Sequence, residues 1–184
     1  MKYWFTADTH FGHTAIICHC SRPFLSVAEM DEALIARWNA VVSPGDIVYH
    51  LGDFALGSIQ KIKEYRQRLR GRIILIRGNH DRRGGAFAAL FDEVHDLHEI
   101  LFNQDGLSQR IVLCHYALRV WPRSHYGAWH LYGHSHGKLP DDPSTLSLDI
   151  GVDCWDFAPV PFEKIGQAME RKGCYTKQGV PEPA

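Results

Sequence analysis

The chain has 184 residues, of which 45% are hydrophobic and 22% are charged, and its formal net charge is −1 with neutral histidines. This length fits one domain, and the composition excludes the highly charged, weakly hydrophobic classes that stay disordered. A net charge near zero gives no overall field that attracts nucleic acid or an anionic membrane, although it is compatible with a local basic patch. We expect one domain over residues 1–175 and a frayed C-terminal tail over residues 176–184.

The cysteine pattern and the first residues favour the cytoplasm. The five cysteines are an odd number without the spacing of a disulfide framework. The N-terminal residues lack the apolar run and cleavage site of a secretory signal, and no apolar run approaches the roughly 20 residues of a membrane helix. The triplet Cys18-His19-Cys20 has no second ligand pair elsewhere, so ordinary thiols are the favoured interpretation. We expect a cytoplasmic protein without a membrane partner.

Short apolar runs alternate with helical patterns, which predicts an α/β fold. The first helix begins after Ser26, where a Ser-x-x-Glu cap precedes apolar residues that recur on one face as far as Ser43-Pro44-Gly45. Further helices are expected over residues 58–70, 86–91 and 163–172, with a turn over 103–108. The predicted strands cover residues 2–7, 47–51, 72–76, 110–114, 128–132 and 146–152.

Polar residues follow directly after five of the six predicted strands. They are Asp8 and His10, then Asp53, then Asn79, His80 and Asp81, then His115, and finally His134 and His136. In an open α/β sheet the carboxyl ends of the strands line one edge, where ligands bind, so these side chains are expected to converge. One Asp or His at a strand end is more often a turn residue, but five in series indicate a shared site.

The spacing and chemistry of this set indicate a metal centre. Asp8 and His10 are two residues apart, as are His134 and His136, and residues i and i+2 of an extended chain point the same way. Each pair is therefore expected to face one centre. Carboxylate, imidazole and amide oxygen without thiolate are typical of Mn²⁺, Fe or Zn²⁺ sites. Seven of these nine groups exceed what one ion uses and suit two divalent ions that share a carboxylate at about 3.5–4 Å.

The sequence resembles the calcineurin-like metallophosphoesterase family through five blocks in order, from about residue 2 to residue 162: Asp8-x-His10, Gly52-Asp53, Gly78-Asn79-His80-Asp81, His115 and Gly133-His134-x-His136. Two longer stretches are similar to a group of small, uncapped bacterial or phage members described as predicted phosphoesterases: Asp8-Thr9-His10-Phe11-Gly12-His13 and Gly151-Val152-Asp153-x-Trp155-Asp156. The resemblance implies a four-layer α/β/β/α sandwich with the site at the sheet edge.

The resemblance also implies a role for each matched residue. Asp53 would bridge two ions. The other ligands would be Asp8, His10 and His136 for the first ion, and Asn79, His115 and His134 for the second. A hydroxide between the ions would attack the phosphorus of a phosphate ester. His80 would bind the phosphoryl group or protonate the leaving oxygen, and Asp81 would orient His80.

Other residues allow two interpretations. His13 either contacts the substrate or lies on the surface. The segment between the fourth and fifth ligand blocks is dense in aromatic and cationic groups, so it forms either a substrate wall or a packed loop over the core. In a substrate wall, Arg119 or Arg123 would pair with a phosphate, and Trp121 or Tyr126 would stack on a base or sugar. Three later carboxylates are expected to stabilise turns: Asp149, Asp153 and Asp156.

The leading functional hypothesis is a binuclear metal-dependent phosphoesterase acting on phosphodiesters of the nucleotide or nucleic acid type. No inserted cap domain is visible, which favours diesters or polymer ends over one small monoester. One alternative is a phosphomonoesterase acting on a phosphoprotein or a small metabolite, because the metal core is shared and only the pocket wall differs. The other is a catalytically silent docking scaffold, which the complete ligand set and His80 disfavour. The sequence leaves the oligomeric state open.

Overall fold

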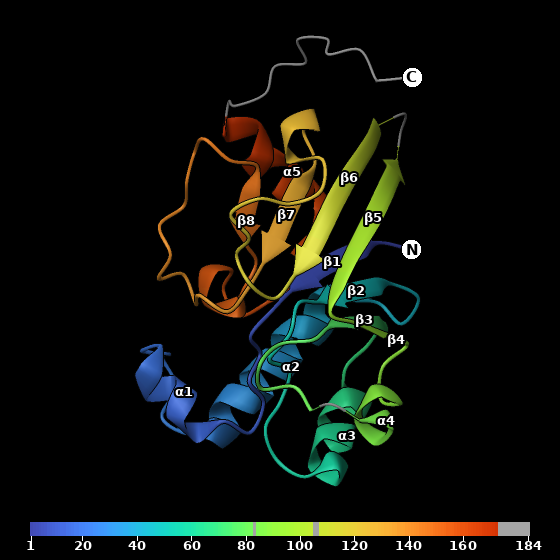
Figure 1. Ribbon diagram of the computed structural model, residues 1–184. Coiled ribbons are helices and arrows are strands. Elements are labelled where there is room, and N and C mark those ends of the chain that lie inside the picture. The colour runs from blue at the N-terminus through green and yellow to red at the C-terminus, as the bar shows by residue number, and fades with distance from the viewer. Residues whose placement is uncertain (83, 105–106, 173–184) are drawn as a thin grey trace.

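The computed structural model describes residues 1–82, 84–104 and 107–172 (Figure 1). Its strands are β1 Tyr3–Thr6, β2 Ile47–His50, β3 Arg72–Ile76, β4 Glu93–His95, β5 Leu97–Gln104, β6 Leu107–Cys114, β7 Trp129–Tyr132, β8 Ser147–Asp149 and β9 Val160–Pro161. They form two sheets, with the orders β4-β3-β2-β1-β9 and β5-β6-β7-β8. Strands β1 to β4 are parallel, as are β6 to β8, whereas β5 and β9 run antiparallel to their neighbours.

The helices are α1 Thr14–His19, α2 Val27–Val41, α3 Ile59–Arg68, α4 Gly85–Ala88 and α5 Phe162–Arg171, with single 3₁₀ turns at Ser124–Tyr126 and Val152–Cys154. The predicted start of α2 is confirmed, because the Ser26 hydroxyl accepts a hydrogen bond from the Glu29 N–H at 3.2 Å. The Glu29 carboxylate accepts in turn from the Leu25 N–H at 2.8 Å. None of the helices within the described ranges is both long and apolar enough to span a membrane.

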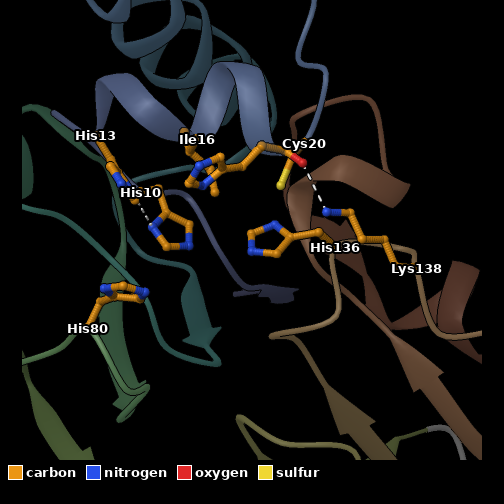
Figure 2. Close-up of a pocket in the computed structure, with 8 residues that line it drawn as sticks. His10, His13, Ile16, Cys20, His80, His136 and Lys138 are labelled. Carbon is orange, nitrogen blue, oxygen red and sulfur yellow. Dashed lines mark hydrogen bonds between the residues drawn. The ribbon is translucent and has the colours of Figure 1, made fainter.

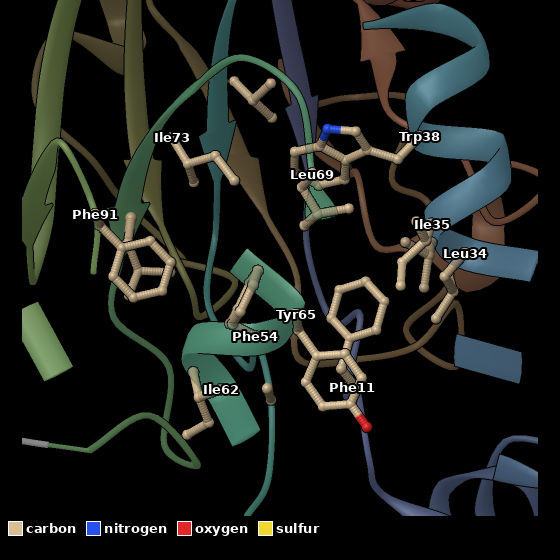
Figure 3. Close-up of a cluster of buried hydrophobic side chains, with 14 of the residues drawn as sticks. Phe11, Leu34, Ile35, Trp38, Phe54, Ile62, Tyr65, Leu69, Ile73 and Phe91 are labelled. Atoms are coloured by element: carbon tan, nitrogen blue, oxygen red, sulfur yellow. The ribbon is translucent and has the colours of Figure 1, made fainter. Parts of the chain in front are cut away.

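Two hydrophobic clusters hold the layers together, one on each face of the first sheet. On the outer face, Ile73 of β3 packs with Trp38 of α2 and Ile62 of α3 (Figure 3). On the inner face, side chains of both sheets meet, and Ile165 and Met169 of α5 join the same cluster. Two facing sheets flanked by helices confirm the predicted α/β/β/α sandwich. The tail over 176–184 lies outside the described residues, and the single domain over 1–175 stays a prediction.

Four short or ambiguous elements were missed by the sequence prediction: α1, β4, β5 and β9. In β5 apolar residues lie on both faces, since Phe102 is buried while Leu97 and Leu101 are 43% and 53% exposed. This pattern hides the alternation that identifies a half-buried strand. Strands β4 and β9 have three and two residues, too few to show any period.

Several predicted bounds were wrong by a few residues. The helix expected over 86–91 ends at Ala88, because after Ala89 the N–H groups bond three residues back, Leu90 to Phe87 and Phe91 to Ala88. Strand β8 ends at Asp149, after which the chain enters a 3₁₀ turn. Strands β5 and β6 extend into the turn expected over 103–108, whose centre, residues 105–106, lies outside the described ranges.

The outer cluster gives a direct stability prediction. Ile62 is fully buried, so Ile62→Ala should lower the free energy of unfolding by about 2–5 kcal/mol. Its neighbour Lys63 is exposed, and Lys63→Ala should change the same free energy by less than about 0.5 kcal/mol. Urea unfolding of both variants measures the difference. Equal unfolding midpoints for the two variants would contradict this packing.

Candidate functional site

The loops after β1, β2, β6 and β7 bring six of the predicted ligands into two groups. The first group is Asp8, His10 and His136, and the second is Asp53, His115 and His134. Within each group, one ligand atom from each residue lies within 4.8 Å of the others. Because β1 and β2 belong to one sheet and β6 and β7 to the other, the site takes ligands from both sheets.

Asp53 lies between the two groups. Its Oδ2 atom is 3.4 Å from Nε2 of His10 and 3.5 Å from Nε2 of His115. Its other oxygen, Oδ1, accepts a hydrogen bond from the backbone N–H of His80 at 2.9 Å. The side chain is 2% exposed, so this carboxylate oxygen faces imidazoles of both groups in a nearly dry environment.

Two buried atoms of the first group have no hydrogen-bond partner among the described residues: Oδ1 of Asp8 and Nε2 of His10. Burial, followed by repulsion from Asp53, raises the pKa of Asp8 well above its ordinary value. Burial, followed by the charge of His136, lowers the pKa of His10. Buried polar atoms are normally paired, and a divalent cation would pair with both of these. The first group therefore fits a metal ion.

The hydrogen bonds of the second group also leave ligand lone pairs free. Nδ1 of His115 donates to the Leu51 carbonyl at 2.7 Å, so in the neutral ring Nε2 is an acceptor. This Nε2 lies 3.1 Å from Oδ1 of Asn79, which is an acceptor too. Two acceptors that face each other are satisfied by a shared cation. Asn79 follows β3, so a fifth strand end contributes to the site, and the second group also fits a metal ion.

His136 is held by a carboxylate that the sequence analysis had placed in a turn. Its Nδ1 donates to Oδ2 of Asp153 at 2.8 Å, which leaves Nε2 unprotonated for a ligand bond. Arg22 donates to both oxygens of Asp153 at 2.8 Å and to the carbonyl of Asp8 at 2.7 Å. Burial alone would raise the pKa of Asp153, but the hydrogen bonds from His136 and Arg22 lower it. Arg22 and Asp153 are 131 residues apart, so no local sequence signal predicts the pair.

The expectation that both spaced pairs are extended was wrong. The φ angles of the five loop ligands are positive: 58° at Asp8, 51° at His10, 55° at Asp53, 66° at His134 and 49° at His136. Non-glycine residues rarely adopt this left-handed conformation, and it clusters at functional sites. Asp8 and His10 still share a group, whereas His134 and His136 lie in different groups.

Gly133 allows the loop after β7 to approach Asp8 closely. A Cβ atom on Gly133 would lie 2.5 Å from Cβ of Ala7 and 2.7 Å from Oδ2 of Asp8. The same Oδ2 accepts a hydrogen bond from the backbone N–H of His134 at 2.8 Å. The Gly133-His134 backbone therefore packs directly on the carboxylate of the first group.

Asp81 contacts groups other than the one expected. Its Oδ2 accepts from the backbone N–H groups of Asp53 and Gly78, both at 2.8 Å, and its Oδ1 accepts from Phe54 N–H at 3.0 Å. Asp81 thus ties the loop after β2 to the loop after β3 and positions the backbone of Asp53, and its expected role in orienting His80 stays a prediction. The His80 ring is 43% exposed, with Nε2 4.0 Å from Oδ2 of Asp53.

A cavity of about 580 Å³ opens beside the first group (Figure 2). Its polar lining includes His10, His80, His136 and the predicted residue His13, whose Nδ1 is 3.1 Å from Nδ1 of His10. Lys138, which belongs to none of the sequence motifs, also lines the cavity. His13 is thus placed where a substrate contact is possible, and its role stays a prediction.

The segment after β6 was expected to be either a substrate wall or a packed loop, and its residues differ in this respect. Trp121 is 8% exposed and its indole N–H donates to the Ala128 carbonyl at 2.8 Å, so this residue belongs to a packed loop. Arg119 and Arg123 are exposed and do not line the cavity of about 580 Å³. Their expected contact with substrate phosphate stays a prediction.

Comparison with known proteins decides the family. The sequence pattern of the calcineurin-like phosphoesterase superfamily domain matches residues 1–150. The chain belongs to this superfamily. Its members are typically metal-dependent hydrolases of phosphoester bonds, which confirms the predicted enzyme class.

Relatives of this phosphoesterase occur in archaea and phages. The uncharacterized protein MJ1445 of Methanocaldococcus jannaschii is 33% identical over 177 residues, which cover 92% of each chain. The Gene 66 protein of Mycobacterium phage L5 is 27% identical over 181 residues, covering 83% of this chain and 86% of that protein. A solved structure of a protein of unknown function from Aquifex aeolicus superposes with a TM-score of 0.68 at 23% identity, covering 91% of this chain and 98% of that one. This last likeness supports the fold.

The carboxylate behind His136 gives a prediction. Asp153→Asn should weaken metal binding by the first group by about 10- to 100-fold, because outer partners fix the orientation and basicity of a ligand histidine. Asp156→Asn is the matched control, since Asp156 is exposed and three residues away. Calorimetric titration with Mn²⁺ measures the affinity of each variant for the metal. Equal affinities in the two variants would contradict the positioning role of Asp153.

Proposed function

We propose that this phosphoesterase holds two divalent ions and hydrolyses phosphodiesters, with nucleotides or nucleic acid ends as the substrate class. The observation that supports it most is the position of Asp53, whose Oδ2 lies 3.4 Å and 3.5 Å from imidazole nitrogens of the two ligand groups. A single carboxylate oxygen between two groups is suited to bridging two ions. The oxygen and nitrogen ligands suit Mn²⁺, Fe or Zn²⁺.

The ligands divide between the ions around the shared carboxylate Asp53. Asp8, His10 and His136 would hold one ion, and Asn79, His115 and His134 the other. When bound, such a pair of ions would lower the pKa of a water between them and offset the charge that builds on the phosphoryl oxygens. Asp153 and Asp81 act behind the ligands, one through His136 and the other through the backbone of Asp53.

His80 is the residue that we propose acts on the substrate. Its backbone N–H is fixed by Asp53, while its ring is 43% exposed and lines the cavity. From this position the imidazole would donate a hydrogen bond to the phosphoryl group, or a proton to the leaving oxygen when the phosphorus–oxygen bond breaks. Its ring lies 5.3 Å from that of His10, which places it over the first ligand group.

Two features support a diester substrate in the cytoplasm. The cavity beside the ligands extends well beyond the space that one phosphoryl group needs, with about 580 Å³. This volume leaves room for a further group beyond the phosphoryl group, as a diester requires. The cysteines among the described residues are unpaired, which is compatible with a reducing compartment.

The test of this proposal is the hydrolysis of bis-p-nitrophenyl phosphate beside p-nitrophenyl phosphate by Mn²⁺-loaded protein. We expect faster cleavage of the diester, and its loss in Asp53→Asn, because this substitution weakens the shared ligand. Faster monoester cleavage would indicate a phosphomonoesterase instead. Cleavage of neither substrate with Mn²⁺, Fe²⁺ or Zn²⁺ would contradict the proposal and favour a docking scaffold.

Metal content is measured on the same samples by mass spectrometry. Asp53→Asn should lower the occupancy of both ions together. Asp156→Asn is the control, because Asp156 is exposed and belongs to neither ligand group. Two tightly bound ions in Asp53→Asn would contradict a bridging carboxylate.

His80→Ala separates catalysis from metal binding. We expect turnover to fall by about 10²- to 10⁴-fold, the usual contribution of a positioned acid or base. Metal content should stay that of the unsubstituted protein, since the ring of His80 is absent from both ligand groups. If His80→Ala empties the site, His80 is a ligand and its proposed role is wrong.

A further inference from the structure

The cavity beside the first ligand group has a basic polar lining. Its titratable nitrogen side chains are His10, His13, His19, His80, His136 and Lys138, and no carboxylate of the described residues lines it. The nearby acidic side chains Asp8 and Asp53 are 0% and 1% exposed, so they lie beneath this wall rather than on it. Because His10 and His136 are proposed metal ligands, the other nitrogen side chains of this lining are the ones left to contact a substrate, and with no acid among them they suit an anionic ligand.

Five of the eight lining residues take no part in the proposed metal binding or proton transfer: His13, Ile16, His19, Cys20 and Lys138. They lie in and around α1 and in the loop after β7, and the lysine among them is Lys138 (Figure 2). A pocket that served only one phosphoryl group would not need an ammonium group beyond the ligand histidines.

The position of Lys138 is fixed by the structure around it. Its backbone N–H donates to the Ser135 carbonyl at 2.8 Å, and the N–H of the preceding Gly137 donates to Asp149 at 3.1 Å. Its Nζ donates to the carbonyl of His19, at the end of α1, at 2.9 Å. An ammonium group has three donors, so two remain for a ligand in the cavity.

We infer that Lys138 forms a subsite for a second phosphate group of the substrate, next to the phosphodiester that is hydrolysed. This inference rests on the proposed function and names its substrate class more closely: a phosphodiester with a further phosphate one linkage away, as in an oligonucleotide with a terminal phosphate. His136 and Lys138 are separated by one residue, so the subsite directly adjoins the first ligand group. The side chain of Lys138 is exposed, so a ligand reaches it without any change of fold.

A matched pair of substrates tests the subsite. The thymidine dinucleotide TpT has one phosphodiester and no other phosphate, and pTpT differs from it only by a 5′-phosphate. We expect a higher kcat/KM for the internal diester of pTpT. Lys138→Met keeps the aliphatic stem without the charge, and it should lower the kcat/KM for pTpT by about 10- to 100-fold, the value of charged hydrogen bonds. The kcat/KM for TpT should stay within about twofold.

Two further variants and one binding measurement complete the test. Lys138→Arg should retain most of the preference for pTpT, and Lys63→Ala, which removes one positive charge on α3, should leave it unchanged. Calorimetric titration in EDTA gives a readout without turnover, in which pTpT should bind more tightly than TpT only when residue 138 is cationic.

The outcomes separate this inference from the proposed function. Equal kcat/KM values for TpT and pTpT, or an equal loss for both in Lys138→Met, would overturn the subsite while the phosphodiesterase activity stands. Failure to cleave any diester, bis-p-nitrophenyl phosphate included, would overturn the proposed function and the subsite with it.

Discussion

The site depends on two buried carboxylates, Asp8 and Asp53, which lie where loops from the two sheets meet. Their exposed fractions are 0% and 1%, and repulsion from Asp53 adds to burial in raising the pKa of Asp8. Buried anions are costly unless they are paired and hydrogen-bonded. Here the backbone N–H groups of His134 and His80 donate to them, and imidazoles line the remaining space. The remaining need for positive charge is what two divalent ions would meet.

The surrounding structure holds these groups in position. The ligand loops adopt left-handed backbone conformations, which cost energy and persist only where neighbours fix them. Asp81 fixes the loop after β2, and Arg22 with Asp153 fixes both the Asp8 carbonyl and His136. Both hydrophobic clusters anchor the strands that end here, so the loops that carry the ligands are attached to rigid elements.

Much of the site could be predicted from sequence, because metal ligands at strand ends carry a strong chemical signal. Six ligands lie in the two groups that the motif blocks implied: Asp8, His10, Asp53, His115, His134 and His136. The partners of these ligands could not be predicted in the same way. The contact between Arg22 and Asp153 joins distant parts of the chain, and an Arg or Asp is ordinary in any turn. Such contacts follow only from the fold.

The elements of the fold were likewise predictable only where the local sequence pattern is clear. The long, periodic helix α2 and the buried strand β3 were predicted within a residue or two, because burial on one face or both leaves a clear pattern. The strand β5 has apolar residues on both faces, and α1 has only 6 residues, so neither shows a hydrophobic period. The extended conformation expected at Asp8 and His134 was wrong because tertiary contacts override local preference.

The central claim is that Asp53 joins two metal ions. Crystals grown with Mn²⁺ and measured at the manganese absorption edge test it most directly. The account predicts two anomalous peaks about 3.5–4 Å apart, both within bonding distance of the Asp53 carboxylate. A single peak, or two peaks of which one does not contact Asp53, would contradict it.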